Sequence, residues 1–249
     1  MIKYLIFLLS LSTTLSAQIM LPAYQGIQYK IPYDTTPVFC ASAGSVATTV
    51  VDVSNPTTGK IWMDRNLGAT QVATSSTDAN SYGDLYQWGR LSDGHQCRNS
   101  GTTSTLSSSD VPENANFILA PLSLYNWRSS QNDNLWQGVS GVNNPCPTGY
   151  RIPTETEWEN ERLSWVQAPV SSTNNATGAF ASPLKLPKAG YREWKSGSIF
   201  ILSPSGKYWS SNVYGNNSKL LIFTDNATSG AIVQFNYRSF GYSVRCIKD

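Results

Sequence analysis

The chain has 249 residues and a formal net charge of +2, and 14% of its residues are charged, against about 25% in an ordinary soluble domain. This charge balance excludes nucleic acid as a partner, because a nucleic-acid-binding domain needs a clustered excess of lysine and arginine. The single histidine, His95, excludes a histidine-built zinc site, and an aromatic content of 12% is too high for a disordered chain.

Residues 1–17 have the features of a secretory signal. Lys3 gives a positive start, a short apolar stretch follows, and small residues end the segment at Ala17. The apolar stretch is too short and too polar to span a membrane, which takes about 20 apolar residues. We therefore expect an exported protein without a membrane span in its mature chain. Its expected location is extracellular, at the cell surface or in the periplasm.

Residues 18–45 are expected to form an extended arm. Pro22, Pro32 and Pro37 interrupt regular structure in this segment, and aromatic residues lie between them. Next along the chain, residues 47–63 predict a β-hairpin, because two strand-like runs flank a turn sequence that contains proline and glycine.

The middle of the chain contains two helix predictions and two loop predictions. Residues 80–90 carry large apolar side chains that suit a short helix, whereas residues 99–110 are nearly all small or polar and predict a surface loop. The stronger helix prediction is 154–166, where a threonine N-cap is followed three residues later by glutamate, as in a capping box. Residues 169–183 are rich in Ser, Asn, Thr and Gly and predict another loop.

The last fifty residues predict short β-strands. In the final strand the two-residue period places Tyr242, Val244 and Cys246 on one face, so Cys246 is expected to point inward. A loop at 225–230 is expected to join two of the strands as a hairpin. The predicted strands are 199–202, 208–209, 220–223, 232–235 and 242–247.

Four cysteines follow the predicted signal, namely Cys40, Cys97, Cys146 and Cys246. An even number of cysteines in an exported protein predicts two disulfides, and the residues alone permit three pairings. The sequence has no Cys-x-x-Cys motif, which argues against a redox centre or a clustered metal site.

Several motifs in order along the chain resemble the Fibrobacter succinogenes major paralogous domain, a family of exported bacterial domains. The resemblance covers roughly residues 47–249 and omits the arm. The motifs are GKIWMDRNLG at 59–68, YGDLYQWGR at 82–90, NNPCPTGYRIPT at 143–154, EW at 157–158, LPKAG at 186–190, YWSS at 208–211 and GYSVRCIK at 241–248.

The resemblance implies one domain over residues 46–249 with a C-type lectin-like fold. That fold is α+β, with two helices, small antiparallel sheets and long irregular loops. It serves both binding proteins and enzymes, so it does not fix the function. In such folds a cysteine near a helix commonly bridges to the final strand. This analogy implies a Cys146–Cys246 disulfide and leaves Cys40–Cys97 as the second.

Catalytic residues are not expected. His95 lies in a turn-like sequence, and no Gly-x-Ser-x-Gly motif presents a nucleophile for it to activate. The predicted helix at 154–166 contains four glutamates. Their expected role is to cap and solvate this helix, rather than to act as paired carboxylates for glycoside hydrolysis. These glutamates are Glu155, Glu157, Glu159 and Glu161.

No metal site or cofactor is assigned, and calcium is the alternative. Lectins of this fold hold calcium through oxygen side chains, and residues 132–134 and 225–226 are candidate oxygen clusters. The sequence lacks the Glu-Pro-Asn and Trp-Asn-Asp signatures of those lectins. Asp and Asn also favour turns for local reasons.

Residues 212–240 are the candidate binding segment, because Tyr, Asn and Ser supply contact area and hydrogen bonds, as in antibody loops. An ordinary polar hairpin surface is the alternative. The tryptophans within the motifs (Trp62, Trp88, Trp158 and Trp209) are expected to be buried. Trp194 has a polar sequence context and is expected to be exposed. The candidate ligand-binding residues are Trp194, Asn212, Tyr214, Asn216, Asn217, Asp225, Asn226, Asn236, Tyr237 and Arg238.

These observations predict an exported, disulfide-stabilised binding protein or adhesin that is not an enzyme. Its expected ligand is a surface glycan or a surface protein, recognised through the C-terminal loops. The alternative is a structural subunit of an extracellular assembly, in which the arm at 18–45 mediates self-association.

Overall fold

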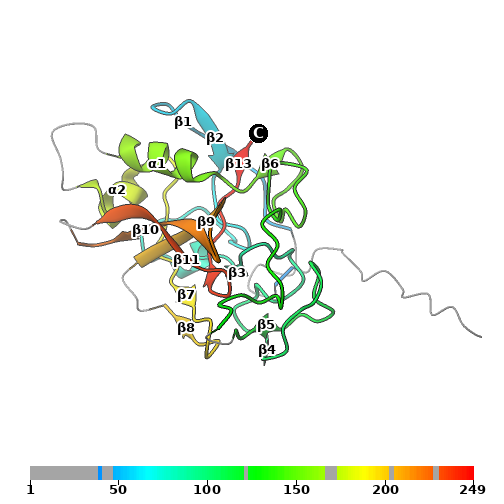
Figure 1. Ribbon diagram of the computed structural model, residues 1–249. Helices are drawn as coiled ribbons and strands as arrows, with labels where there is room; N and C mark the ends of the chain where they lie inside the picture. Colours follow the sequence, from blue (N-terminus) through cyan, green and yellow to red (C-terminus); the bar gives the residue numbers. More distant parts are fainter. Residues whose placement is uncertain (1–38, 41–46, 121–122, 166–172, 202–204, 227–229) are drawn as a thin grey trace, which may run out of the picture. The chain divides into compact units, whose positions relative to one another are not determined.

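The computed structural model describes residues 39–40, 47–120, 123–165, 173–201, 205–226 and 230–249. The predicted signal and most of the predicted arm therefore lie outside the described residues. All described residues belong to one compact unit, Tyr33–Asp249. As expected, this part of the chain is α+β, with few helices and several small antiparallel sheets (Figure 1). It contains no helix that is long and apolar enough to cross a membrane.

The capped helix predicted from the sequence is present as α1, Glu155–Ser164. Thr154 accepts a hydrogen bond from the Glu157 N–H through its side chain, and the Glu157 carboxylate accepts one from the Thr154 N–H. This reciprocal capping box satisfies two N–H groups that the first helical turn leaves without partners. The helix ends slightly earlier than predicted, with Trp165 as its C-cap.

A second helix, α2 (Ala176–Ala181), occupies a segment that was predicted to be a loop. The Asn175 side chain caps it by accepting hydrogen bonds from the N–H groups of Thr177 and Gly178. A Cβ at Gly178 would lie 1.8 Å from the carbonyl oxygen of Thr173, so this turn requires glycine. The loop prediction was wrong because these local contacts, rather than composition, determine the structure.

The helix predicted at residues 80–90 does not form. One turn of 3-10 helix, η2 (Ala79–Ser81), is followed by the short strand β3 (Tyr86–Gln87). Gly83 and Gly89 have φ values of +65° and +85°, a left-handed conformation that interrupts an α-helix. The large apolar side chains that suggested a helix are nevertheless buried, namely Tyr82, Leu85, Tyr86 and Trp88.

The described strands form four small sheets, with strand orders β1-β2-β13-β6, β3-β12-β7-β8, β11-β10-β9 and β4-β5. The pairing is antiparallel except between β4 and β5. The bounds of the strands not yet given are β1 Asp52–Asn55, β2 Lys60–Met63, β4 Thr102–Thr103, β5 Phe117–Ile118, β6 Tyr150–Arg151, β7 Tyr191–Arg192, β8 Ile199–Phe200, β9 Ser205–Tyr214, β10 Asn217–Thr224, β11 Ala231–Tyr237, β12 Gly241–Tyr242 and β13 Ile247–Lys248.

The predicted hairpin at 47–63 is confirmed as β1 and β2, although its first strand begins at Asp52. The loop prediction at 99–110 was wrong at Thr102–Thr103, which form β4. Strands are present at each predicted C-terminal position, and residues 225–230 connect β10 to β11 as expected. The predicted last strand is divided between β12 and β13, which belong to different sheets.

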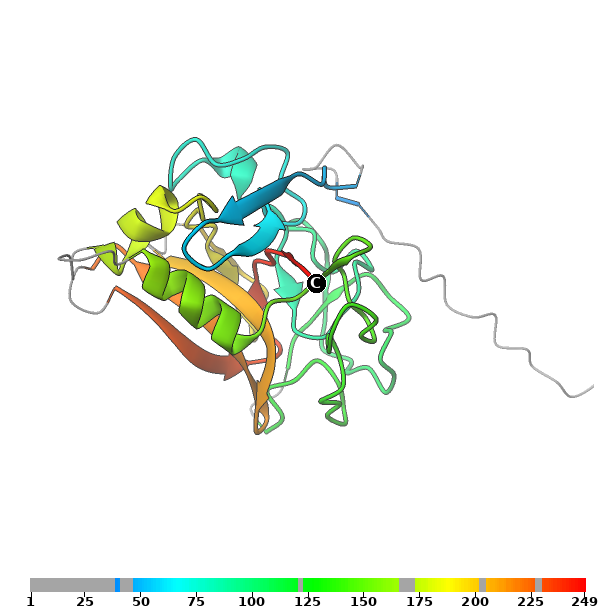
Figure 2. The same ribbon diagram turned by 90° about the horizontal axis from the view of Figure 1, so that it is seen from above.

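The sheet β11-β10-β9 separates two hydrophobic cores. Helix α1 packs along one face of this sheet (Figure 2). On that face Leu221 and Phe223 of β10 share a core with Trp158 and Trp165. On the other face, Trp209 and Leu220 join a second core beneath the irregular loops. Neighbouring residues of β10 therefore serve different cores, as the alternation of a strand requires.

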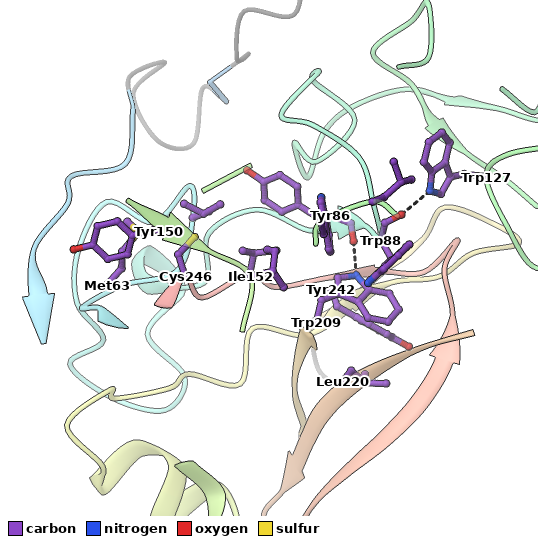
Figure 3. Close-up of a cluster of buried hydrophobic side chains, with 14 of the residues drawn as sticks. Met63, Tyr86, Trp88, Trp127, Tyr150, Ile152, Trp209, Leu220, Tyr242 and Cys246 are labelled. Atoms are coloured by element: carbon purple, nitrogen blue, oxygen red, sulfur yellow. Dashed lines mark hydrogen bonds between the residues drawn. The ribbon is translucent and has the colours of Figure 1, made fainter. Parts of the chain in front are cut away.

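Buried tryptophans connect these loops to the sheets through their indole N–H groups. Trp209 donates to the carbonyl oxygen of Tyr86 at 2.7 Å, and Trp127 donates to that of Trp88 at 2.7 Å (Figure 3). Trp88 in turn donates to Ser210 at 2.9 Å. The prediction that the motif tryptophans are buried is confirmed, since Trp62, Trp88, Trp158 and Trp209 are each at most 1% exposed.

Two disulfides join Cys146 to Cys246 and Cys40 to Cys97, which is the pairing that the resemblance implies. Cys246 points inward, as expected, and is fully buried. In the chain-entropy description, closing a loop of about 100 residues stabilises a fold by roughly 4–5 kcal/mol. Disulfides persist in oxidising compartments, which is consistent with an extracellular protein.

Candidate functional site

The structure does not bring the predicted ligand-binding residues together at one site. Tyr214, Asn216 and Asn217 lie at the β9–β10 turn, and Asn217 pairs with Tyr237 of β11. The exposed residues 225–226 lie at the opposite end of β10. At about 3.3 Å per residue, the length of β10 separates the two groups by roughly 25 Å.

Arg238 was predicted to contact ligand, but its side chain is 1% exposed and has a structural role. It donates to the Asp133 carboxylate at 2.7 Å and to the carbonyl oxygens of Asn217 and Gly215. Its guanidinium carbon lies 4.4 Å from the centroid of the Trp88 ring. Arg238 therefore ties the β9–β10 turn to a neighbouring loop and does not face solvent.

The expected exposure of Trp194 was also wrong, because this residue is only 8% exposed. Its ring packs against Tyr125 and Tyr237 at centroid distances of 5.4 and 5.6 Å. Asn212 is engaged as well, since its side chain accepts the Glu155 N–H at 2.6 Å, at the start of α1. Trp194 is therefore a packing residue beneath Tyr125 and Tyr237, and Asn212 caps the start of α1.

Around Trp194 and Tyr237, aromatic rings form a continuous series, which we call the aromatic surface. Successive ring centroids are 5.1 Å apart for Phe200 and Tyr191, and 6.2 Å for Tyr191 and Tyr242. The series continues through Phe240 to Tyr237 at 5.3 and 6.1 Å. The aromatic surface consists of Tyr125, Tyr191, Trp194, Phe200, Tyr237, Phe240 and Tyr242.

The aromatic surface combines buried and accessible rings. Phe200 is 43% exposed, whereas Tyr242 is fully buried and Trp194 nearly so. The other four rings are half-buried. The Asn236 amide donates to the Tyr242 hydroxyl at 2.8 Å, which fixes this predicted ligand residue beside the rings. The result is a packed group of rings that is accessible at Phe200 and at its half-buried members.

Four elements position the rings, and β7 and β12 are hydrogen-bonded neighbours in one sheet. Tyr191 lies on β7, Phe200 on β8 and Tyr242 on β12, while Tyr237 ends β11. Sequence reasoning did not assign five of the seven rings to a binding site, namely Tyr125, Tyr191, Phe200, Phe240 and Tyr242. Only the two-residue spacing of Phe240 and Tyr242 signals that a pair of these rings lies on one side of the chain, where they stack at a centroid distance of 5.3 Å.

His95 has no catalytic geometry in this structure. Its Nδ1 lies 2.5 Å from Asp93, and its Nε2 accepts the Gln87 N–H at 3.0 Å. Burial, assisted by the positive charge of Arg90, lowers the pKa of His95 to about 4. The histidine is fully buried and neutral. Its hydrogen bond with Gln87 connects a loop to β3.

The two candidate calcium clusters are engaged with the protein itself. Asp133 binds Arg238 and accepts from Gln131, and Asp225 forms an ion pair with Lys188 at 2.6 Å. Across the described ranges, no group of three or more His, Cys, Asp or Glu side chains is arranged to hold a metal ion.

Comparison with known proteins gives no family for the chain. No protein-family model, curated protein or solved structure matches it. The C-type lectin-like fold and the resemblance to the major paralogous domain therefore stay predictions, and the function rests on the site itself.

Proposed function

We propose that the protein is an exported binding protein or adhesin that recognises a surface glycan through the aromatic surface and has no enzymatic activity. The continuous series of partly exposed rings carries this proposal. Aromatic side chains offer large, rigid contact area at little cost in conformational entropy. Contiguous apolar surface that stays accessible on a folded protein is a feature of interaction sites.

The backbone at the edge of this surface supports a binding role. Tyr125 has a φ of +53°, although a bulky non-glycine residue rarely adopts a left-handed conformation. Its ring stacks on Tyr237 at a centroid distance of 3.9 Å. Such strain concentrates at ligand-binding sites, where the surrounding structure holds a side chain in place for its contacts.

The test is a glycan array probed with the mature chain, residues 18–249, followed by calorimetry on any hit. Tyr191→Ala and Phe200→Ala should each weaken binding at least tenfold, because they remove the most accessible stacked pair of the aromatic surface. Phe235→Ala is the matched control, since Phe235 is 48% exposed and stacks on Tyr214 outside the aromatic surface.

A folded, disulfide-bonded sample that binds no glycan would contradict the proposal. So would a hit whose affinity falls with Phe235→Ala and not with Tyr191→Ala. If the sample instead forms oligomers that disappear when residues 18–38 are deleted, a structural role in an extracellular assembly replaces glycan binding. Deletion up to residue 38 leaves Cys40 available for its disulfide with Cys97.

A further inference from the structure

The ammonium group of Lys207 lies against the aromatic surface without an anionic partner. Its Nζ is 3.7 Å from the ring centroid of Tyr191 and 5.5 Å from that of Tyr242. Among the described residues, this Nζ has no ion pair and no hydrogen bond. Cation–π attraction is therefore its main compensation for lost hydration.

Comparison with the other described lysines shows that this arrangement is distinctive. Four of them contact a carboxylate within 4 Å, namely Lys60, Lys188, Lys219 and Lys248. Lys185 and Lys195 have no such partner, but both are exposed to water. Lys207 is the described lysine that combines partial burial with the absence of a carboxylate.

The strand register explains why Lys207 faces this surface. Lys207 of β9 pairs with Ile222 of β10, which pairs with Ile232 of β11. Paired residues of an antiparallel sheet share a face, so the lysine is the first member of an apolar row. Ile222 packs against the core that contains Tyr242, with Tyr191 at its edge, so the register places Lys207 on the face of the sheet that meets these rings.

The titratable groups near Lys207 do not neutralise it. Tyr191 and Tyr242 face it from β7 and β12, and burial raises the pKa of both hydroxyls. Glu193 also acts on these tyrosines, but its carboxylate accepts the N–H groups of Lys195 and Ser196 within its own turn. Burial lowers the pKa of Lys207 to about 8, as expected for an ammonium without a counter-ion.

We propose that the aromatic surface binds acidic glycans, in which a sugar ring contacts Tyr191 and Phe200 while an anionic substituent pairs with Lys207. This inference rests on the proposed function and names its ligand class. An anion would restore the electrostatic partner that the fold withholds, in a partly dry environment where a charge pair is stronger than in water. A neutral glycan would leave the ammonium group uncompensated.

Calorimetry with defined oligosaccharides tests the inference. The probes are an oligogalacturonate, its neutral methyl ester of equal length and a sulfated heparin oligosaccharide. At pH 7 we expect at least one acidic probe to bind about tenfold more tightly than the methyl ester, a preference that falls at 0.5 M salt. The affinities for galacturonate and heparin then distinguish a carboxylate from a sulfate ligand.

Substitutions test whether the preference for acidic probes depends on Lys207. Lys207→Met should abolish it, Lys207→Arg should keep most of it, and Lys185→Met, which changes a lysine 5.3 Å from the ring centroid of Phe180, should leave it unchanged. The preference should also decline as pH rises from 7 to 9, because Lys207 loses its proton near pH 8. Near-UV circular dichroism confirms that each variant is folded.

The outcomes separate this inference from the proposed function. Equal affinity for the acidic probes and the methyl ester, or an acidic preference that survives Lys207→Met, overturns the acidic-glycan inference alone. Loss of binding with Tyr191→Ala in that case keeps the glycan-binding proposal. If acidic and neutral probes all fail to bind the folded protein, both are overturned.

Discussion

The indole hydrogen bonds of the buried tryptophans make a measurable prediction about stability. Trp62 and Trp158 are packed against each other at a centroid distance of 4.8 Å, and both are at most 1% exposed. They differ in one respect. Trp158 donates to the carbonyl oxygen of Trp209 at 3.0 Å, whereas the Nε1 of Trp62 has no hydrogen-bond partner among the residues that the structure describes.

Replacing each tryptophan by phenylalanine removes the same atoms from the same core, so the cavity left behind should cost a similar free energy of unfolding in both variants. Trp158→Phe additionally removes a buried hydrogen bond, which costs about 1–3 kcal/mol when an acceptor loses its partner. Trp62→Phe instead removes a buried donor that had no partner. We expect Trp158→Phe to lose about 1–3 kcal/mol more stability than Trp62→Phe.

Urea unfolding of both variants with intact disulfides measures the difference, provided that the slope of free energy against urea is unchanged. Tryptophan fluorescence and far-UV circular dichroism should report coincident transitions, as two-state unfolding requires. A Trp62→Phe loss equal to or larger than that of Trp158→Phe would refute the reasoning. Packing would then determine stability, and the indole hydrogen bonds would contribute nothing measurable.

Three further predictions concern the backbone, a buried carboxyl group and a disulfide. Gly68→Ala should lower the melting temperature much more than Gly59→Ala, because a Cβ at Gly68 would lie 2.2 Å from the Asp84 side chain. Gly59 has a similarly positive φ, but a Cβ there would meet no atom within 4 Å. Equal losses would show that crowding is irrelevant. Burial raises the pKa of Asp84 to about 7. The folded state therefore keeps a proton that the unfolded carboxyl loses near pH 4, so urea unfolding should show stability falling as pH rises from about 4 to 7. Asp84→Asn should flatten this profile, and an unchanged profile would contradict the assignment to Asp84. Replacing Cys146 and Cys246 by alanine should lower the free energy of unfolding by about 4–5 kcal/mol, and a loss below about 1 kcal/mol would contradict the chain-entropy explanation.

Structure that depends on local signals was predictable from the sequence. The Thr154–Glu157 capping box acts within one helical turn, so its pattern correctly predicted the start of α1. Two-residue alternation likewise placed Cys246 in the core. By contrast, residues 80–90 have an apolar pattern that suits a helix, and left-handed backbone at Gly83 and Gly89 overrides it.

The binding surface was less predictable because its members are distant in the sequence. Trp194 has charged neighbours, which suggested exposure, but Tyr125 and Tyr237 cover it from other segments. Composition marked Tyr237 and Asn236 as candidate ligand-binding residues, but it marked Asp225 equally. In the structure Tyr237 pairs with the first residue of β10, whereas Asp225 follows the last one. Lys207 was missed because the absence of a counter-ion is a property of the folded surface alone.

The positions of β12 and β13 have a consequence for biogenesis. β12 lies between β3 and β7, and β13 lies between β2 and β6, so residues 241–248 supply an interior strand to two separate sheets. A chain is synthesised with its N-terminus first, and neither sheet can close until this segment has been made. A nascent chain stopped before residue 241 would expose unpaired strand edges, which favour aggregation. These two sheets are therefore expected to complete their folding only after residues 241–248 have been synthesised.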